Sequence, residues 1–248
     1  DLMKEFPDGV LDVLDVAGLG PKKLKNLRDE LKIKNADDLE KACNEGKVAV
    51  LEGMGEKTQE KLLESLRYFQ KSAGRMLLPE ADRYSKEIIG YLKKAKVFKR
   101  LESAGSLRRG SETVGDIDIL AVASDAVKAM EHFVKYPMAR TIIARGETKS
   151  SIKIKDGPQV DVRVIEPDSW GAALVYFTGS KLHNVKIRHI AKNKGLKVSE
   201  YGVFTAPKAG GKEKLVAGET EEEVYRALGM AYIPPEMRED HGEVELAL

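Results

Sequence analysis

Two aspartates that stand one residue apart are the first candidates for chemistry. Asp116 and Asp118 lie in the segment DIDILAVAS, directly after a glycine. Side chains alternate along a β-strand, so residues two apart project from the same face, and the apolar residues between them suit a buried strand. Two neighbouring carboxylates raise each other's pKa unless a cation compensates them, and a divalent metal is the usual cation. From these two residues alone, a pair of solvated acids at a strand edge is an open alternative.

A third acid strengthens the metal hypothesis. Asp161 lies in QVDVRVI, flanked by valines, and Arg163 follows on the same face of the expected strand. A cross-strand salt bridge is the alternative for this segment. Three carboxylates on adjacent strands can hold two Mg²⁺ ions about 3.5–4 Å apart, with Mn²⁺ as a possible substitute. Such a centre would activate a 3′-hydroxyl and neutralise a triphosphate and its leaving pyrophosphate.

A glycine and a hydroxyl precede the two aspartates. Gly105 and Ser106 stand before a short expected helical turn that contains Arg108 and Arg109. Small residues before a helix N-terminus can cradle a phosphate group. This Gly-Ser pair, followed after eight to twelve residues by Asp-x-Asp, is the signature pattern of the nucleotidyltransferase superfamily.

The first 78 residues read as short helices separated by two Gly-x-Gly hairpins. Their glycines are Gly18 and Gly20 in one copy and Gly53 and Gly55 in the other. Backbone N–H groups at a helix start, with lysines nearby, can bind DNA phosphates without reading bases. A purely structural helical bundle is the alternative. The lysines are Lys22 and Lys57, with Lys23, Lys25 and Lys61 beside them.

The composition sets broad limits. The 248-residue chain is 33% charged with a net charge of +2, and its one cysteine, Cys43, permits no internal disulfide, which fits a reducing compartment. No segment has the length and apolarity of a membrane span. Residues from Trp170 to about Asn193 are expected to be helical. The stretch 181–197 carries six lysines and arginines and no acid, which indicates a polyanion site or a solvated helix face.

The motifs together resemble a known family. The hairpins resemble the helix-hairpin-helix motif of DNA repair proteins. GSLRRGSETVGDIDIL, QVDVRVI, YFTGSKLHNVKIR and SEYGVF occur in the order seen in family X DNA polymerases, the DNA polymerase beta group, and are most similar to its bacterial and archaeal branch. The resemblance implies an α+β fold in three parts. These are helical fingers with tandem helix-hairpin-helix motifs (1–78), a nucleotidyltransferase-type palm with a mixed sheet (79–165) and an α/β thumb (166–248).

The resemblance also implies roles for individual residues. Asp116, Asp118 and Asp161 are the catalytic metal ligands. Nucleotide contacts fall to Gly105, Ser106, Arg109, Gly115, Tyr176, Phe177, Gly179 and Asn184. DNA contacts fall to Gly18, Gly20, Lys22, Gly53, Gly55, Lys57, Arg163 and Arg188. The carbonyls of Leu14, Val16 and Leu19 would hold Na⁺ or K⁺ at the first hairpin. Lys181 and Val114 replace an acid and a serine of the beta enzyme, departures that bear on nucleotide affinity and fidelity.

We therefore expect a template-directed DNA polymerase that fills gaps in repair. Its partners are gapped or primer-template DNA and a deoxynucleoside triphosphate, without a membrane; we expect a cytoplasmic, nucleoid-associated monomer. The expected chain is a polymerase core that lacks the family's N-terminal lyase-type domain and the C-terminal phosphoesterase (PHP) domain of the bacterial branch. A template-independent nucleotidyltransferase is one alternative, although such relatives tend to carry Gly-Trp in place of Tyr176-Phe177. A non-catalytic scaffold that binds DNA ends is the other, against which the three acids argue.

Overall fold

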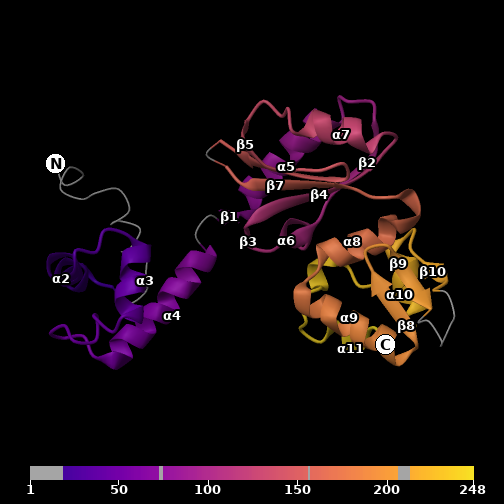
Figure 1. Cartoon of the computed structure of the whole chain (residues 1–248). Coiled ribbons are helices and arrows are strands. Elements are labelled where there is room, and N and C mark those ends of the chain that lie inside the picture. The colour runs from indigo at the N-terminus through magenta and orange to yellow at the C-terminus, as the bar shows by residue number, and fades with distance from the viewer. Residues whose placement is uncertain (1–18, 73–74, 156, 206–212) are drawn as a thin grey trace. The chain divides into compact units, whose positions relative to one another are not determined.

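The structure is a computed structural model that describes residues 19–72, 75–155, 157–205 and 213–248. The chain divides into two compact units, Asp1–Ala73 and Gly74–Leu248 (Figure 1). The division falls at Ala73 because the short strand β1 (Met76–Leu77) pairs with β3 (Thr113–Val114) inside the second unit. The predicted three-part division at residues 78 and 165 stays a prediction.

The described part of the first unit is helical. It consists of α2 (Pro21–Leu31), α3 (Ala36–Asn44) and α4 (Glu56–Ser72). The Asn35 side chain caps α3 by accepting the backbone N–H of Asp38 at 2.9 Å, a common way to satisfy a helix start. Leucines at helical spacing, including Leu24, Leu27 and Leu62, are buried together in one apolar cluster.

A five-stranded sheet forms the centre of the second unit. Strand β4 runs parallel to β7, and every other neighbouring pair is antiparallel, which makes the sheet mixed as predicted. The strand order is β2-β4-β7-β6-β5. The strands are β2 (Phe98–Ser103), β4 (Asp116–Ala123), β5 (Ala139–Arg145), β6 (Lys149–Ile154) and β7 (Gln159–Val164).

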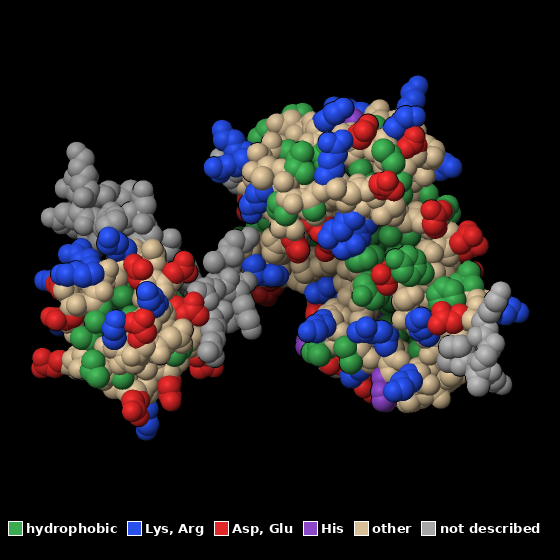
Figure 2. All heavy atoms as spheres, in the orientation of Figure 1, with side chains coloured by type: hydrophobic (Ala, Val, Ile, Leu, Met, Phe, Trp, Pro, Cys, Tyr) green, Lys and Arg blue, Asp and Glu red, His purple; other side chains and the backbone are tan. Residues whose placement is uncertain are grey.

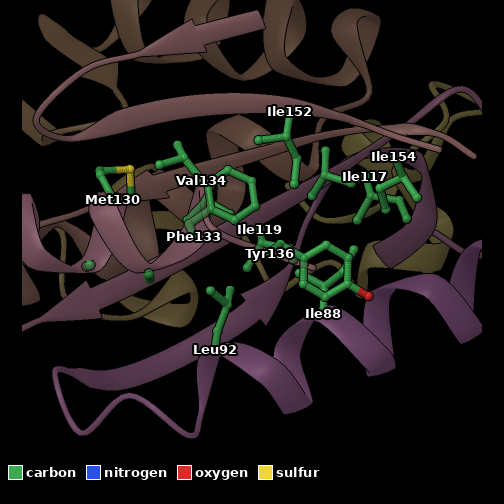
Figure 3. Close-up of a cluster of buried hydrophobic side chains, with 14 of the residues drawn as sticks. Ile88, Leu92, Ile117, Ile119, Met130, Phe133, Val134, Tyr136, Ile152 and Ile154 are labelled. Atoms are coloured by element: carbon green, nitrogen blue, oxygen red, sulfur yellow. The ribbon is translucent and has the colours of Figure 1, made fainter. Parts of the chain in front are cut away.

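Helices cover both faces of β4. Ile117 and Ile119 are buried on one face against α5 (Leu78–Leu92) and α7 (Ala126–Phe133), in the apolar cluster of Figure 3. Leu120 is buried on the opposite face with residues of α8 (Trp170–Thr178), close to the short helix α6 (Gly105–Arg108). Since side chains alternate, Asp116 and Asp118 project from this second face, which we call the acid face.

The chain after the sheet forms an α/β layer. Gly179 ends α8 with a positive φ of 72°, and Ser180 caps the next helix, α9 (Lys181–Asn193), so the predicted continuous helix from 170 to 193 is two helices. The remaining elements are η2 (Pro167–Ser169), β8 (Leu196–Ser199), β9 (Gly202–Thr205), β10 (Leu215–Ala217), α10 (Glu221–Ala227), η3 (Pro235–Met237) and α11 (Glu243–Leu246). The architecture confirms the predicted α+β class.

A helix that crosses a bilayer must be long and apolar. No helix in the described ranges meets both requirements.

Candidate active site

The register of two parallel strands brings the predicted acids together. Asp118 of β4 lies opposite Asp161 of β7, and Asp116 lies opposite Gln159. Paired strands run about 4.8 Å apart, so Asp118 and Asp161 are neighbours on the acid face. Asp116 is exposed, Asp118 is half-buried, and Asp161 is only 7% exposed. Exposure to solvent therefore decreases across the acid face from Asp116 through Asp118 to Asp161.

Asp118 is the most perturbed of the three carboxyl groups. Burial, followed by the negative charges of Asp116 and Asp161, raises the pKa of Asp118 to about 6, against the weaker opposing effect of the Arg163 and Lys149 charges. Burial and the two neighbouring negative charges each penalise the ionised form of Asp118. The acid face therefore holds more negative charge than its own cations balance.

Asp161 has a different environment. Its carboxylate accepts a hydrogen bond from Gln159 Nε2 at 2.9 Å and faces Lys149 Nζ at 3.0 Å. Burial works against ionisation, but the hydrogen bonds from Gln159, Lys149 and Ser151 outweigh it and lower the pKa of Asp161. The sequence did not single out Lys149, because only the pairing of β6 with β7 brings this lysine to Asp161.

The donor chemistry of the acid face fits a divalent cation. Hard cations prefer carboxylate oxygens, and positive charge there would relieve the repulsion that raises the Asp118 pKa. Among the residues that the structure describes, however, no three acidic, histidine or cysteine side chains are grouped so that they could hold a metal. Asp161 is instead engaged by Lys149. Ligation by Asp116, Asp118 and Asp161 therefore stays a prediction.

The Gly-Ser turn meets the acid face at Gly105. This residue has a φ of +61°, which favours glycine, and a Cβ built there would lie 2.7 Å from Asp118 Oδ2. The Ala104 N–H also donates to the Asp118 carbonyl at 2.8 Å. Glycine is thus required at position 105 both by the backbone and by the closeness of the carboxylate.

We predict that Gly105→Ala displaces the Asp118 carboxylate and lowers nucleotide insertion by about tenfold or more, as for a catalytic group moved from its working geometry. Gly110→Ala is the matched control. Gly110 also has a positive φ, +67°, but its added Cβ would meet only Glu236 Cγ at 4.0 Å. Primer extension and thermal unfolding should be measured for both variants. Equal losses of activity would show that backbone strain, and not the Asp118 contact, explains the glycine.

A cavity of about 420 Å³ between α8 and α9 gathers most of the predicted nucleotide contacts. Arg109, which directly follows α6, reaches this cavity. Its NH1 group donates to the Thr178 carbonyl at 2.6 Å and its Nε to Glu239 at 2.6 Å. Asn184 donates to the Tyr176 carbonyl at 2.7 Å. The lining residues are Arg109, Tyr176, Phe177, Thr178, Gly179, Lys181, Asn184 and Arg188.

Other predicted site residues of the second unit lie outside that lining, among them Ser106, Gly115 and Arg163. Ser106 is half-buried on α6. Gly115 lies beside the guanidinium of Arg75, which donates to Thr113 Oγ1 at 2.9 Å and to the Thr113 carbonyl at 2.6 Å. Arg163 lies 4.6 Å from the centre of the Phe177 ring, a cation–π contact that connects the acid face with α8. Arg75, like Lys149, had no signal in the sequence.

The first unit presents its hairpin lysines at helix starts. Gly20 precedes α2 in an extended conformation, and the Gly55 carbonyl accepts the N–H groups of Thr58 and Gln59 in the first turn of α4. Gly53 has a φ of +76°. Lys22 and Lys57 are exposed in the first turns of α2 and α4, while Leu19 is buried. The other predicted hairpin residues, Leu14, Val16 and Gly18, lie outside the described residues.

If these lysines neutralise DNA phosphates, Lys22→Ala and Lys57→Ala should each reduce the slope of log affinity against log salt by about 0.9 on duplex DNA. Each variant should lose the same DNA affinity for unrelated DNA sequences, because phosphate contacts carry no base information. DNA titrations at several salt concentrations, with two unrelated sequences, measure both the slope and the affinity loss. The exposed Lys99→Ala, in β2, is a control for the loss of one charge. An unchanged slope in the hairpin variants would contradict the phosphate assignment.

Three lysines of the basic stretch 181–197 have partners within the protein. Lys186 is paired with Asp240 and Glu245, Lys197 is paired with Glu213, and Lys194 donates to the Leu228 carbonyl. Figure 2 shows basic and acidic side chains interspersed on the visible face. Lys181 and Arg188, which line the α8–α9 cavity, are thus the more relevant cations for a phosphate ligand.

Comparisons with known proteins match both units. Residues 10–67 match the SAM-like helix-hairpin-helix tandem family, and residues 173–239 match the DNA polymerase beta thumb family. Among curated proteins, the DNA polymerase/3′-5′ exonuclease PolX of Bacillus subtilis (strain 168) is 37% identical over 246 residues, 98% of this chain and 42% of that protein. Rat DNA polymerase lambda is 28% identical, over 55% of this chain and 28% of that protein. The repair DNA polymerase X of African swine fever virus (isolate Tick/Malawi/Lil 20-1/1983) is 26% identical, over 62% and 95%.

Solved structures show the same fold. The ternary gap complex of Leishmania infantum polymerase beta aligns with a TM-score of 0.60 at 23% identity, over 96% of this chain and 93% of that chain. Its ternary P/T complex aligns with a TM-score of 0.58 at 24% identity, over 94% and 100%. The chain spans less than half the length of the B. subtilis protein, but the match runs through both units. The chain therefore belongs to the family X DNA polymerases.

Proposed function

We propose that the chain is the polymerase core of a template-directed DNA polymerase that fills short gaps. The observation that carries this proposal is the register of β4 and β7, which places Asp118 beside Asp161 and next to the Gly105 turn. The substrates are gapped or primer-template DNA and a deoxynucleoside triphosphate. The primer 3′-oxygen forms a bond to the α-phosphorus, the α–β phosphoanhydride bond breaks, and pyrophosphate leaves.

The chain's own residues orient the reactants. Arg109 presents its guanidinium to the triphosphate at the wall of the α8–α9 cavity, and Asn184 lies where it can donate to the base. The backbone at Gly179 lies against the sugar, where a 2′-hydroxyl would be crowded. Asp116, Asp118 and Asp161 would hold two Mg²⁺ ions, with Mn²⁺ as a substitute, which supply positive charge to the 3′-oxygen and to the triphosphate.

The relatives support this role. The viral relative is named a repair polymerase, and the Leishmania polymerase beta structures include a gap complex. Gap filling in repair is the corresponding proposal for this chain. A cation at the first hairpin, a monomeric state and a cytoplasmic location beside the nucleoid stay predictions.

Primer extension on two substrates, with Mg²⁺ and with a chelator, tests the proposal. On a gapped duplex with Mg²⁺, we expect insertion of the complementary nucleotide only. A blunt single strand should not be extended, and a chelator should abolish the reaction. Extension of the single strand would instead indicate a template-independent transferase, and binding of gapped DNA without any extension would indicate a scaffold.

A further inference from the structure

Helix α9 has two faces with different partners. Lys181, Asn184 and Arg188 line the α8–α9 cavity, and their spacing of three, four and seven residues places them on one side of a helix. His183 and Lys186 lie on the opposite side, because each residue advances about 100° around the axis. The contacts on this second side therefore fix the direction in which the cavity side of α9 points.

The second side is held by residues 238–245, which we call the C-terminal strap. The Arg238 carbonyl accepts the Ser180 N–H at 3.0 Å, directly before α9. Lys186 Nζ lies 2.5 Å from Asp240 and 2.6 Å from Glu245, but this pair is partly exposed and contributes little. The His183 Nδ1 atom lies 2.8 Å from Glu243 Oε1. The strap thus contacts α9 at its start and over its first two turns.

The contact at His183 is part of a buried network of three side chains. His183 and Tyr225 are 0% exposed and Glu243 is 6% exposed. Burial, the largest effect, lowers the pKa of His183, although hydrogen bonding to Glu243 opposes it. A neutral ring that donates from Nδ1 to Glu243 can accept from the Tyr225 hydroxyl at Nε2, which is 2.8 Å away. Glu243 also accepts the N–H groups of Asp240 and His241, at 3.1 and 2.8 Å.

We infer that His183, held by Tyr225 and Glu243, is a positioning residue that fixes the rotation of α9 and so aims Asn184 and Lys181 into the cavity. An apolar side chain at position 183 could fill the same space while tolerating small rotations of the helix. Two hydrogen bonds of defined direction permit one orientation only. The inference rests on the proposed function, since it assigns these residues to the recognition of the incoming nucleotide.

Tyr225→Phe provides the sharpest test, because it removes one hydroxyl and keeps the ring. We expect its KM for the complementary nucleotide to rise about fivefold, the equivalent of one hydrogen bond, with little change in kcat. Selectivity against mismatched nucleotides should fall. Tyr136→Phe is the matched control, since Tyr136 is also buried but belongs to the apolar cluster beneath the sheet. It should behave as the wild type.

Variants of Glu243 separate positioning from general stability. Glu243→Gln keeps one oxygen that can accept from His183 but loses the acceptor for the His241 N–H, so its KM should rise less than that of Glu243→Met, which removes both acceptors and should raise the KM at least as much as Tyr225→Phe does. A folded Tyr225→Phe protein with wild-type KM and selectivity would overturn the inference. If the wild type extends no primer, the proposed function fails. In that case NMR tests the inference without any activity, through the side-chain amide signals of Asn184, which are identified by their loss in Asn184→Ala. These signals should shift in Tyr225→Phe and not in Tyr136→Phe. Unshifted signals in Tyr225→Phe would refute the inference.

Discussion

Replacing Asp161 by Asn is expected to slow the chemical step of nucleotide insertion by a factor of about 10²–10³, a loss typical of a missing electrostatic contact to a transition state. Asn keeps the shape of the side chain but removes one negative charge from the acid face. By the family resemblance, Asp161 is expected to serve the primer 3′-hydroxyl alone. In the proposed function the triphosphate is held elsewhere, by Asp116, Asp118 and the Gly105-Ser106 turn, so nucleotide affinity should change little.

Asp118→Asn is the comparison. Asp118 lies against the Gly105 turn and is expected to serve both the hydroxyl and the triphosphate, so this variant should lose nucleotide affinity as well as rate. Nucleotide titrations with a dideoxy-terminated primer give the affinity, and single-turnover extension of a normal primer gives the rate. If Asp161→Asn weakened nucleotide binding as much as Asp118→Asn, or extended primers at nearly the wild-type rate, the separate role of Asp161 would be wrong.

Replacing Glu221 by Ala is expected to lower the free energy of unfolding by about 3–5 kcal/mol, because it leaves the buried Arg238 and the partly buried Arg108 without their counter-charge. Glu221 bonds Arg108 at 2.8 and 2.6 Å and Arg238 at 2.7 Å. Arg238 is 0% exposed. Its other bonds, to the Ile233 carbonyl at 2.9 and 2.8 Å, satisfy hydrogens but do not neutralise its charge.

The same network makes a prediction about pH. Burial alone would raise the pKa of Glu221, but the hydrogen bonds and charges of Arg108 and Arg238 outweigh it and lower the pKa below its ordinary value of 4.5. The unfolded chain therefore binds the proton more readily. The stabilisation is complete above pH 4.5 and disappears as the pH falls through the lower value of the folded protein.

Urea unfolding at decreasing pH checks both statements. The difference in stability between the wild type and Glu221→Ala should shrink as the solution is acidified below the ordinary glutamate pKa. Glu222→Ala, at an exposed position in the same turn of α10, should stay within about 0.5 kcal/mol of the wild type at every pH. A constant difference between wild type and Glu221→Ala would mean that the carboxylate charge is not what stabilises the network.

The placement of the acids could be predicted because it depends on short-range periodicity. Alternation alone places Asp116 and Asp118 on one face of a strand and Asp161 on one face of another. Their mutual register could not be derived, since it depends on how far β7 slides along β4. The role of Gly105 was predicted only in part: the phosphate turn could be predicted, but not its close contact with Asp118.

Contacts between segments that are distant in the chain could not be predicted from the sequence. Lys149 reaches Asp161 through strand pairing, and Glu221 meets Arg108 across 113 residues. His183 was predicted only as part of a basic stretch, because the sequence does not reveal that Glu243 and Tyr225 surround it. The break between α8 and α9 was also missed, although Thr-Gly-Ser carries its signal: a glycine at positive φ followed by a serine cap.

The most direct test of the central claim uses Asp118→Asn on a one-nucleotide gapped duplex. The claim is that the acid face performs nucleotidyl transfer, whereas DNA is bound by other parts of the chain. The variant should bind the gapped duplex as tightly as the wild type but insert essentially no nucleotide, while the wild type inserts the complementary nucleotide and releases one pyrophosphate for each insertion. Insertion by Asp118→Asn at the wild-type rate would contradict the account.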